Sequence, residues 1–196
     1  AAADSSHDAV MLAGVAGLFA GALSMAAGEY VSVRSQREMY EYQIGLEREE
    51  LGQYPEEEAS ELALIYQARG IPEEEAQRMA NVILVDPTQA LDTLAREELG
   101  LNPAELGSPW GAAISSFVSF ALGAMVPLLP FAFHAGTGSL YVSVGLTAAA
   151  LFGVGIVISL FTGRQAFRGG LRMLAIGGVA GLLTYFIGRL LGVTLG

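Results

Sequence analysis

Residues 10–33 of the chain read VMLAGVAGLFAGALSMAAGEYVSV, and Glu29 is the one charged residue among them. A helix of this length can cross the hydrocarbon core of a bilayer. A cleaved signal peptide would carry basic residues ahead of its apolar part, whereas Asp4 and Asp8 precede this stretch. We therefore predict a transmembrane helix over residues 10–33 that follows a polar loop over residues 1–9.

Three further apolar stretches follow in the second half of the sequence and are predicted as transmembrane helices. They cover residues 108–133, 140–161 and 171–196. Ser108 and Pro109 suit the cap and the first turn of the helix that they open. The mean hydropathy of +0.47 is high for a soluble protein. The predicted fold class is therefore an all-α membrane protein with four transmembrane helices in this chain.

The arginines indicate how the chain is oriented in the membrane. Arg34 and Arg37 directly follow the first apolar stretch, and Arg164, Arg168 and Arg172 lie in the predicted loop between the last two. Basic residues are enriched in cytoplasmic loops. We expect both groups of arginines, and the acidic segment after the first, to face the cytoplasm, with both chain ends outside.

The composition excludes several classes of function. The chain has no Cys, so it can form neither a disulfide nor a thiolate metal site. It has no Lys and a net charge of −10, which argues against nucleic acid as a partner. No set of Ser, His and Asp resembles a hydrolytic triad, and no glycine loop suits phosphate binding. We expect no enzyme activity, no catalytic residue and no catalytic cofactor.

Residues 34–107 hold most of the acidic residues and are predicted to form a cytoplasmic helical domain. Proline and glycine divide this segment into short helices. The expected first helical positions are Pro55, Pro72 and Pro87, the expected cap is Asp86, and the expected helix ends lie just before Gly70 and Gly100. No proline lies between residues 29 and 50, so one long helix is expected to run from the membrane into this domain.

Five glutamates lie on or beside the apolar faces of three of these predicted helices, at about 100° per residue. They are Glu47, Glu50, Glu58, Glu61 and Glu98. Glu56 points the opposite way, toward water. Carboxylates that packing brings together repel one another and lose solvation, so they need protons or cations. The pattern favours a metal site.

Solvated helix faces are the alternative reading of the same glutamates, because short acidic runs usually face water. If the site is real, its donors are carboxylate oxygens, since no His or Cys lies between Glu29 and Glu105. Such donors suit Mg, Ca, Mn or Fe(II) and do not suit a structural zinc site. The ligand chemistry leaves the choice among these ions open.

Three stretches of the sequence resemble the vacuolar iron transporter (VIT) family. They are GALSMAAGEYVSVRSQRE at 21–38, SFALGAMVPLLPF at 119–131 and GRLLG at 188–192, and the resemblance covers essentially the whole chain. It implies a dimer of five-span subunits with a cytoplasmic metal-binding domain between spans two and three. It also implies export of Fe(II), often also Mn(II), from the cytoplasm in exchange for protons.

The resemblance also assigns particular residues. The family's metal-domain glutamates fall on the five glutamates named above, and its second-span methionine falls on Met25. Glu29, one helical turn further on, is a second candidate for the ion pathway, because an acid within an apolar span is usually functional. The alternatives are a packing role for Met25 and solvation at the interface for Glu29.

The chain departs from the family pattern in two respects. Leu94 and Ala95 stand where some members have methionines, so no thioether ligand is expected there. The family's acidic first span has no counterpart in the sequence. We therefore expect a fragment, a subunit whose first span comes from elsewhere, or part of a larger protein with a ferritin-like domain ahead of this membrane unit.

The sequence thus predicts an integral membrane protein that exports Fe(II), with Mn(II) as a second cargo, and that assembles as a homodimer. Its location would be the cytoplasmic membrane in a bacterium or the vacuolar membrane in a eukaryote. One alternative is a membrane-anchored metal buffer or sensor that does not transport. Another is a membrane scaffold whose acidic domain is merely solvated.

Overall fold

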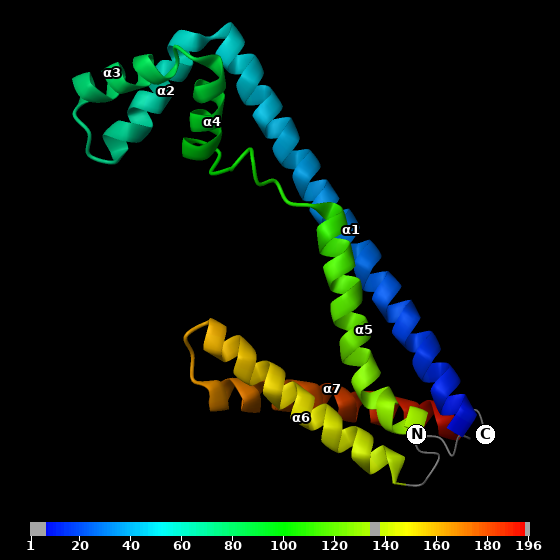
Figure 1. Cartoon of the computed structure of the whole chain (residues 1–196). Helices are drawn as coiled ribbons and strands as arrows, with labels where there is room; N and C mark the ends of the chain where they lie inside the picture. The colour runs from blue at the N-terminus through cyan, green and yellow to red at the C-terminus, as the bar shows by residue number, and fades with distance from the viewer. Residues whose placement is uncertain (1–6, 134–137, 195–196) are drawn as a thin grey trace. The chain divides into compact units, whose positions relative to one another are not determined.

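The computed structural model of the chain describes residues 7–133 and 138–194, and all regular elements within those ranges are helices. The predicted all-α class is therefore confirmed (Figure 1). The helices are α1 (His7–Gln53), α2 (Pro55–Ala68), α3 (Glu73–Ile83), α4 (Pro87–Glu97), α5 (Pro109–Phe133), α6 (Ser139–Phe161) and α7 (Ala166–Thr194). Most of the predicted loop over residues 1–9 lies outside the described residues.

The chain divides into two compact units. One comprises Ala1–Ala26 and Ile114–Gly196, and the other comprises Ala27–Ala113. Helix α1 continues without a break from one into the other. The predicted long helix from the membrane segment toward Glu50 is thereby confirmed.

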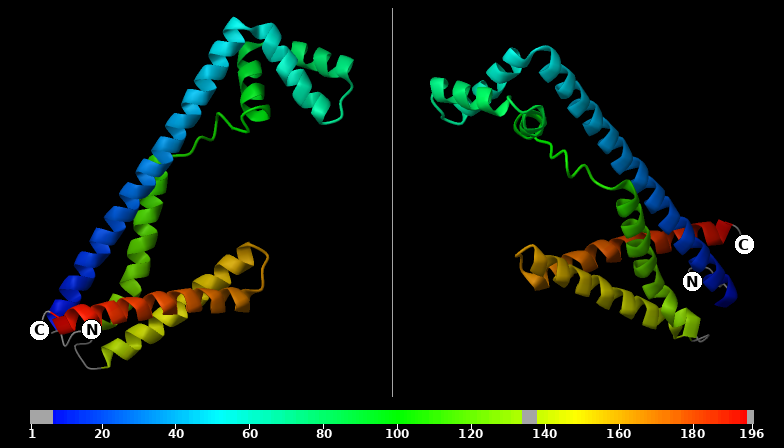
Figure 2. Two further views of the ribbon diagram at one scale, coloured as in Figure 1. Left: turned by 180° about the vertical axis from the view of Figure 1, so that it is seen from behind. Right: turned by 45° about the horizontal axis from the view of Figure 1, so that its top comes forward.

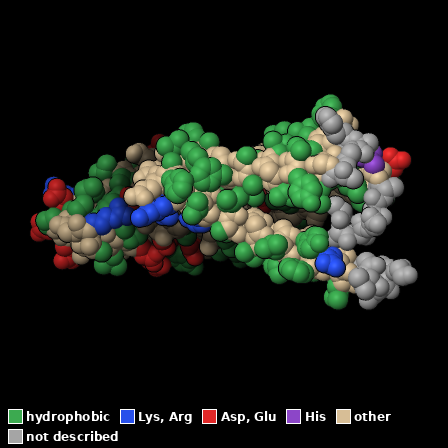
Figure 3. All heavy atoms as spheres, turned by 90° about the horizontal axis from the view of Figure 1, so that it is seen from below, with side chains coloured by type: hydrophobic (Ala, Val, Ile, Leu, Met, Phe, Trp, Pro, Cys, Tyr) green, Lys and Arg blue, Asp and Glu red, His purple; other side chains and the backbone are tan. Residues whose placement is uncertain are grey.

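The first unit contains the apolar helices. Four helices of the described chain are long and apolar enough to cross a membrane, namely α1, α5, α6 and the Ala166–Leu191 part of α7. Large apolar side chains along them are exposed, for example Leu12, Val144 and Phe186. Apolar side chains are also spread along the face seen in Figure 3. Side chains of this kind are suited to contact with lipid.

Helices α6 and α7 form an antiparallel hairpin and lie side by side in every view (Figures 1 and 2). Glycines allow the close approach: a Cβ added at Gly155 would lie 2.5 Å from the carbonyl oxygen of Gly169. A Cβ added at Gly170 would lie 2.6 Å from the ring of Phe152. The pairing of these two helices therefore depends on residues that have no side chain at the contact.

Helix α7 begins at Ala166, earlier than the predicted start at residue 171. Arg168 and Arg172 consequently lie on this helix and not in the preceding loop. Gly163, with φ of 65°, ends α6, and nothing in the sequence after Gln165 breaks a helix. The glycine pair at 169–170 serves the contact with α6 and does not interrupt α7.

The second unit packs α2, α3 and α4 around a small core. Its buried members are Leu62, Ala63, Tyr66, Ala76, Ala80 and Leu94. Three of the six are alanines, which let short helices approach closely. An ion pair between Arg69 and Glu97 also joins the end of α2 to the end of α4.

Most of the helix boundaries in this unit follow the predicted signals. Pro55 opens α2 and Pro87 opens α4, and the carboxylate of Asp86 accepts hydrogen bonds from the backbone N–H of Thr88 (2.8 Å) and Gln89 (3.4 Å). Gly70 takes up the left-handed conformation after α2, with φ of 95°. Pro72 differs from the prediction, since it caps α3 from outside instead of occupying the first turn.

Candidate metal centre

Glu47 lies on the buried face of α1 within the second unit. Its side chain is 3% exposed, and Ile44, three residues earlier on the same face, is 7% exposed. Helical periodicity puts these residues on one side of α1, as the sequence predicts. The carboxyl group of Glu47 is therefore shielded from water, so its charged form is poorly solvated.

Glu58 lies in the first turn of α2 and is 6% exposed. It shares the buried face of this helix with Leu62 and Tyr66. The unpaired N–H groups at a helix N-terminus favour a negative charge, which offsets part of the cost of burying this carboxylate. Glu56, two residues earlier, is exposed, as the helical phase predicts.

Glu98 follows the last residue of α4 and is the exposed member of the group. One carboxylate oxygen from each of Glu47, Glu58 and Glu98 lies within 4.8 Å of those of the other two. We call this group the carboxylate cluster. Three helices contribute to it, because α1, α2 and the end of α4 each supply one ligand.

The cluster contains oxygen atoms without partners. Glu47 Oε1 and Glu58 Oε2 are buried and accept no hydrogen bond from any described residue. Buried polar atoms are normally satisfied, and an exception needs a physical explanation. A cation bound between the carboxylates would satisfy both atoms at once.

Burial and mutual repulsion make the carboxyl groups of the cluster unusually basic. Burial, then the charges of Glu98 and Glu58, raise the pKa of Glu47 to about 8. Burial also raises the pKa of Glu58, although a hydrogen bond with Glu47 opposes this. The pKa of Glu98 is raised by burial and then by the charges of Glu61 and Glu50. Each of these effects would be relieved by a bound cation.

Glu50 and Glu61 are exposed and lie outside the group of three. Their charges still act on it, since Glu61 raises the pKa of both Glu58 and Glu98. Each lies three residues from a member of the cluster, so each is rotated about 60° from it around its helix. That rotation puts both side chains at the exposed rim of the cluster.

Met25 and Glu29 both lie on α1 and both are exposed, Met25 at 49%. They are one turn apart on a continuous helix. Within residues 7–133 and 138–194, the carboxylate cluster is the one group of three or more His, Cys, Asp or Glu residues with converging ligand atoms, and Glu29 is not part of it. The pathway role of these two residues remains a prediction.

These features define a class: a multi-span helical membrane protein with an acidic helical unit that can hold a divalent cation. A model of the VIT family matches residues 1–189, and the chain belongs to that family. The chain is 37% identical over 194 residues to a vacuolar iron transporter of Acanthamoeba castellanii. That alignment covers 96% of this chain and 72% of the relative. It is 32% identical over 189 residues to vacuolar iron transporter 1 of Arabidopsis thaliana, over 95% of this chain and 75% of the relative. These relatives are named as transporters and not as enzymes.

Proposed function

We propose that this protein transports Fe(II), with Mn(II) as a second cargo, out of the cytoplasm in exchange for protons. Membership of the VIT family supports a role in iron transport, since the relatives are named vacuolar iron transporters. The observation that carries the proposal is the carboxylate cluster, with its two buried oxygens that no described residue partners.

Glu47, Glu58 and Glu98 are proposed to bind the ion, and Glu50 and Glu61 to attract it. Carboxylate oxygens suit hard and borderline divalent ions, which include Fe(II) and Mn(II). The two rim glutamates add negative potential at the entrance and so raise the local concentration of cations. On this proposal the cluster collects ions from the cytoplasm before they enter the membrane part.

The chemistry of the cluster supports exchange with protons. Each carboxyl must lose its proton before it can bind a cation, so protons and metal compete for the same oxygens. Because burial and neighbouring charges raise the pKa of Glu47 to about 8, this competition would operate at neutral pH. A lower pH on the side that the cluster faces would therefore favour release of metal from the cluster.

The membrane part of the path is proposed to use Met25 and Glu29. A thioether sulfur and a single carboxylate form a weak pair of ligands for Fe(II), and weak binding suits a path that must release its ion. Arg34 and Arg37 follow on the same helix, which supports a cytoplasmic position for this end of α1. A homodimer would shield such a path from lipid.

Vesicle flux combined with a binding measurement tests the proposal. The full-length gene product is reconstituted into vesicles, and Fe(II) entry is followed with and without a pH gradient. The double variant Met25→Ala, Glu29→Gln should abolish flux and leave metal binding by the cluster intact. Metal binding without flux in the unaltered protein would indicate the buffer or sensor instead, and normal flux in the double variant would refute the pathway.

A further inference from the structure

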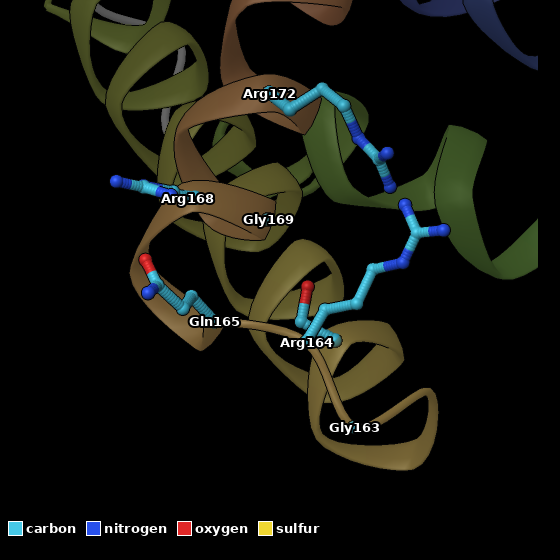
Figure 4. A pocket seen from close by; sticks show the side chains of 7 residues that line it. Gly163, Arg164, Gln165, Arg168, Gly169 and Arg172 are labelled. Carbon is cyan, nitrogen blue, oxygen red and sulfur yellow. The ribbon is translucent and has the colours of Figure 1, made fainter.

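The connection between α6 and α7 carries a pocket of about 410 Å³ that the proposed transport does not use. Three arginines line it, namely Arg164, Arg168 and Arg172, together with Ser159 and Gln165. In Figure 4 the side chains of Arg164 and Arg172 extend toward one another on one side, whereas Arg168 points to the other. Two guanidinium groups are therefore directed at one place.

Helices α5, α6 and α7 carry no acidic side chain that could balance these charges. No Asp or Glu follows Glu105 in the sequence. The arginines that follow the first span are different, since Arg34 pairs with Glu38 and Arg37 with Glu41, each at 2.7 Å. Among the described residues of the first unit, no ion pair involves Arg164 or Arg172. The pocket consequently concentrates positive charge that an anion would neutralise.

The backbone at this place adds to the same effect. Residue 165 caps α7, since its carbonyl accepts the N–H of Gly169 at 3.1 Å, and the first N–H groups of that helix have no partner within the helix. The N-terminus of a helix carries a partial positive charge that favours anions. Planar guanidinium groups bind the oxygens of a phosphate in pairs, which a single point charge cannot do.

The pocket lies at the expected membrane interface. One candidate span ends at Phe161 and the next begins at Ala166, so the pocket lies where two membrane helices reach the interface. Phe161 is 89% exposed and Leu171 is 52% exposed, so apolar surface for acyl chains adjoins the arginines. Basic pockets between membrane helices bind lipid headgroups in this way.

We propose that the pocket formed by Arg164, Arg172 and the start of α7 is a phosphate site that takes the headgroup of an anionic membrane lipid. The same chemistry could bind free phosphate, but soluble phosphate would make no use of the adjoining apolar surface. A bound lipid would stabilise the α6–α7 hairpin, whose contact rests on glycines. This role is independent of the proposed metal transport.

Native mass spectrometry of the full chain, titrated with phosphatidylglycerol or phosphatidylcholine, tests the proposal. The unaltered protein should bind phosphatidylglycerol more tightly than phosphatidylcholine. Arg164→Gln together with Arg172→Gln should weaken binding of phosphatidylglycerol about 30-fold, because each basic side chain at a membrane surface contributes about fivefold. Arg189→Gln is the matched control, since it removes the same charge from α7 outside the pocket, and it should change affinity less than twofold.

Two comparisons on the unaltered protein keep the test independent of how the variants fold. Equal affinity for the two lipids would overturn the proposal. Displacement of bound phosphatidylglycerol by millimolar inorganic phosphate, but not by chloride of equal ionic strength, would assign the site to soluble phosphate and reject the lipid. Equal losses in the double variant and in Arg189→Gln would mean diffuse attraction without a site.

Discussion

Replacing Glu47 by Gln should stabilise the metal-free protein and, at the same time, weaken its binding of metal. The amide has nearly the size of the carboxyl group but never ionises. In the folded protein burial and the charges of Glu98 and Glu58 raise the pKa of Glu47 to about 8, against an ordinary value of 4.5. The protonated form of Glu47 is therefore the one that the fold favours, and the Gln variant imitates it permanently.

The sign and the size of the effect follow from linkage between protonation and folding. Below about pH 4.5 Glu47 is protonated in both the folded and the unfolded chain, and its ionisation costs nothing. As the pH rises from 4.5 to about 8, the unfolded chain ionises first and stability is lost. A pKa difference of about 3.5, at about 1.4 kcal/mol for each unit, sets a ceiling of about 5 kcal/mol near pH 8.

Hydrogen exchange of α2 in the full chain, read by mass spectrometry in detergent, measures this stability locally. With intrinsic rates corrected for pH, the Glu47→Gln variant should match the unaltered protein near pH 5 and be more protected near pH 8. Mn(II) at 100 times its dissociation constant should add about 2.7 kcal/mol to the unaltered protein and much less to the variant. Glu56→Gln removes an exposed carboxylate from the same unit and should change neither quantity.

Two results would refute this reasoning. If Glu47→Gln lowers the protection of α2 at pH 8, the carboxylate is stabilising in its charged form and is not held in an unfavourable site. If Glu47→Gln and Glu56→Gln behave alike at both pH values, the burial of Glu47 has no energetic consequence.

Three further predictions follow from the same structure. Calorimetry should show Mn(II) affinity at least tenfold lower for Glu58→Gln, because a buried ligand is lost, and nearly unchanged for Glu56→Gln; equal effects would indicate diffuse charge attraction. Single cysteines at Gln53 and Gln165 should both react with a membrane-impermeant reagent from the cytoplasmic side, and reaction from opposite sides would contradict the orientation proposed from the arginines. Light scattering in detergent should give the mass of two chains, since paired subunits shield a polar path from lipid; a monomer at every concentration would argue against a dimer.

Local signals in the sequence were sufficient for most of the helix boundaries. Pro55, Pro87 and the Asp86 cap act through backbone chemistry that is the same in any fold, and so does the left-handed glycine at position 70. The start of α7 could not be predicted in this way. Gly169 and Gly170 lie within the predicted loop, yet a glycine that packs against a neighbouring helix is compatible with a helix, and only the tertiary contact reveals that.

Helical periodicity predicted which face of its helix each glutamate of the candidate site occupies. Periodicity assigned Glu47 and Glu58 to apolar faces, and both are buried. Periodicity could not separate them from Glu50 and Glu61, because a rotation of about 60° around a short helix is within the error of the predicted phase. The position of the neighbouring helix decides which of the two glutamates on each helix is buried. The arginine pocket was not predicted as a site, because the sequence placed Arg164, Arg168 and Arg172 together only as residues of a cytoplasmic loop, and the turn into α7 decides which of them converge.

The chemistry of the proposed metal centre rests on which residues its helices place next to the glutamates. Leu94 and Ala95 occupy the positions where the family resemblance would allow methionines, and both are fully buried, Leu94 within the core that also contains Leu62. The three converging ligand atoms of Glu47, Glu58 and Glu98 are carboxylate oxygens. Carboxylate oxygen donors favour hard or borderline divalent ions over soft ones. Carboxylate ligands also make metal binding by the cluster sensitive to pH, because each of them must lose its proton before it can bind a cation.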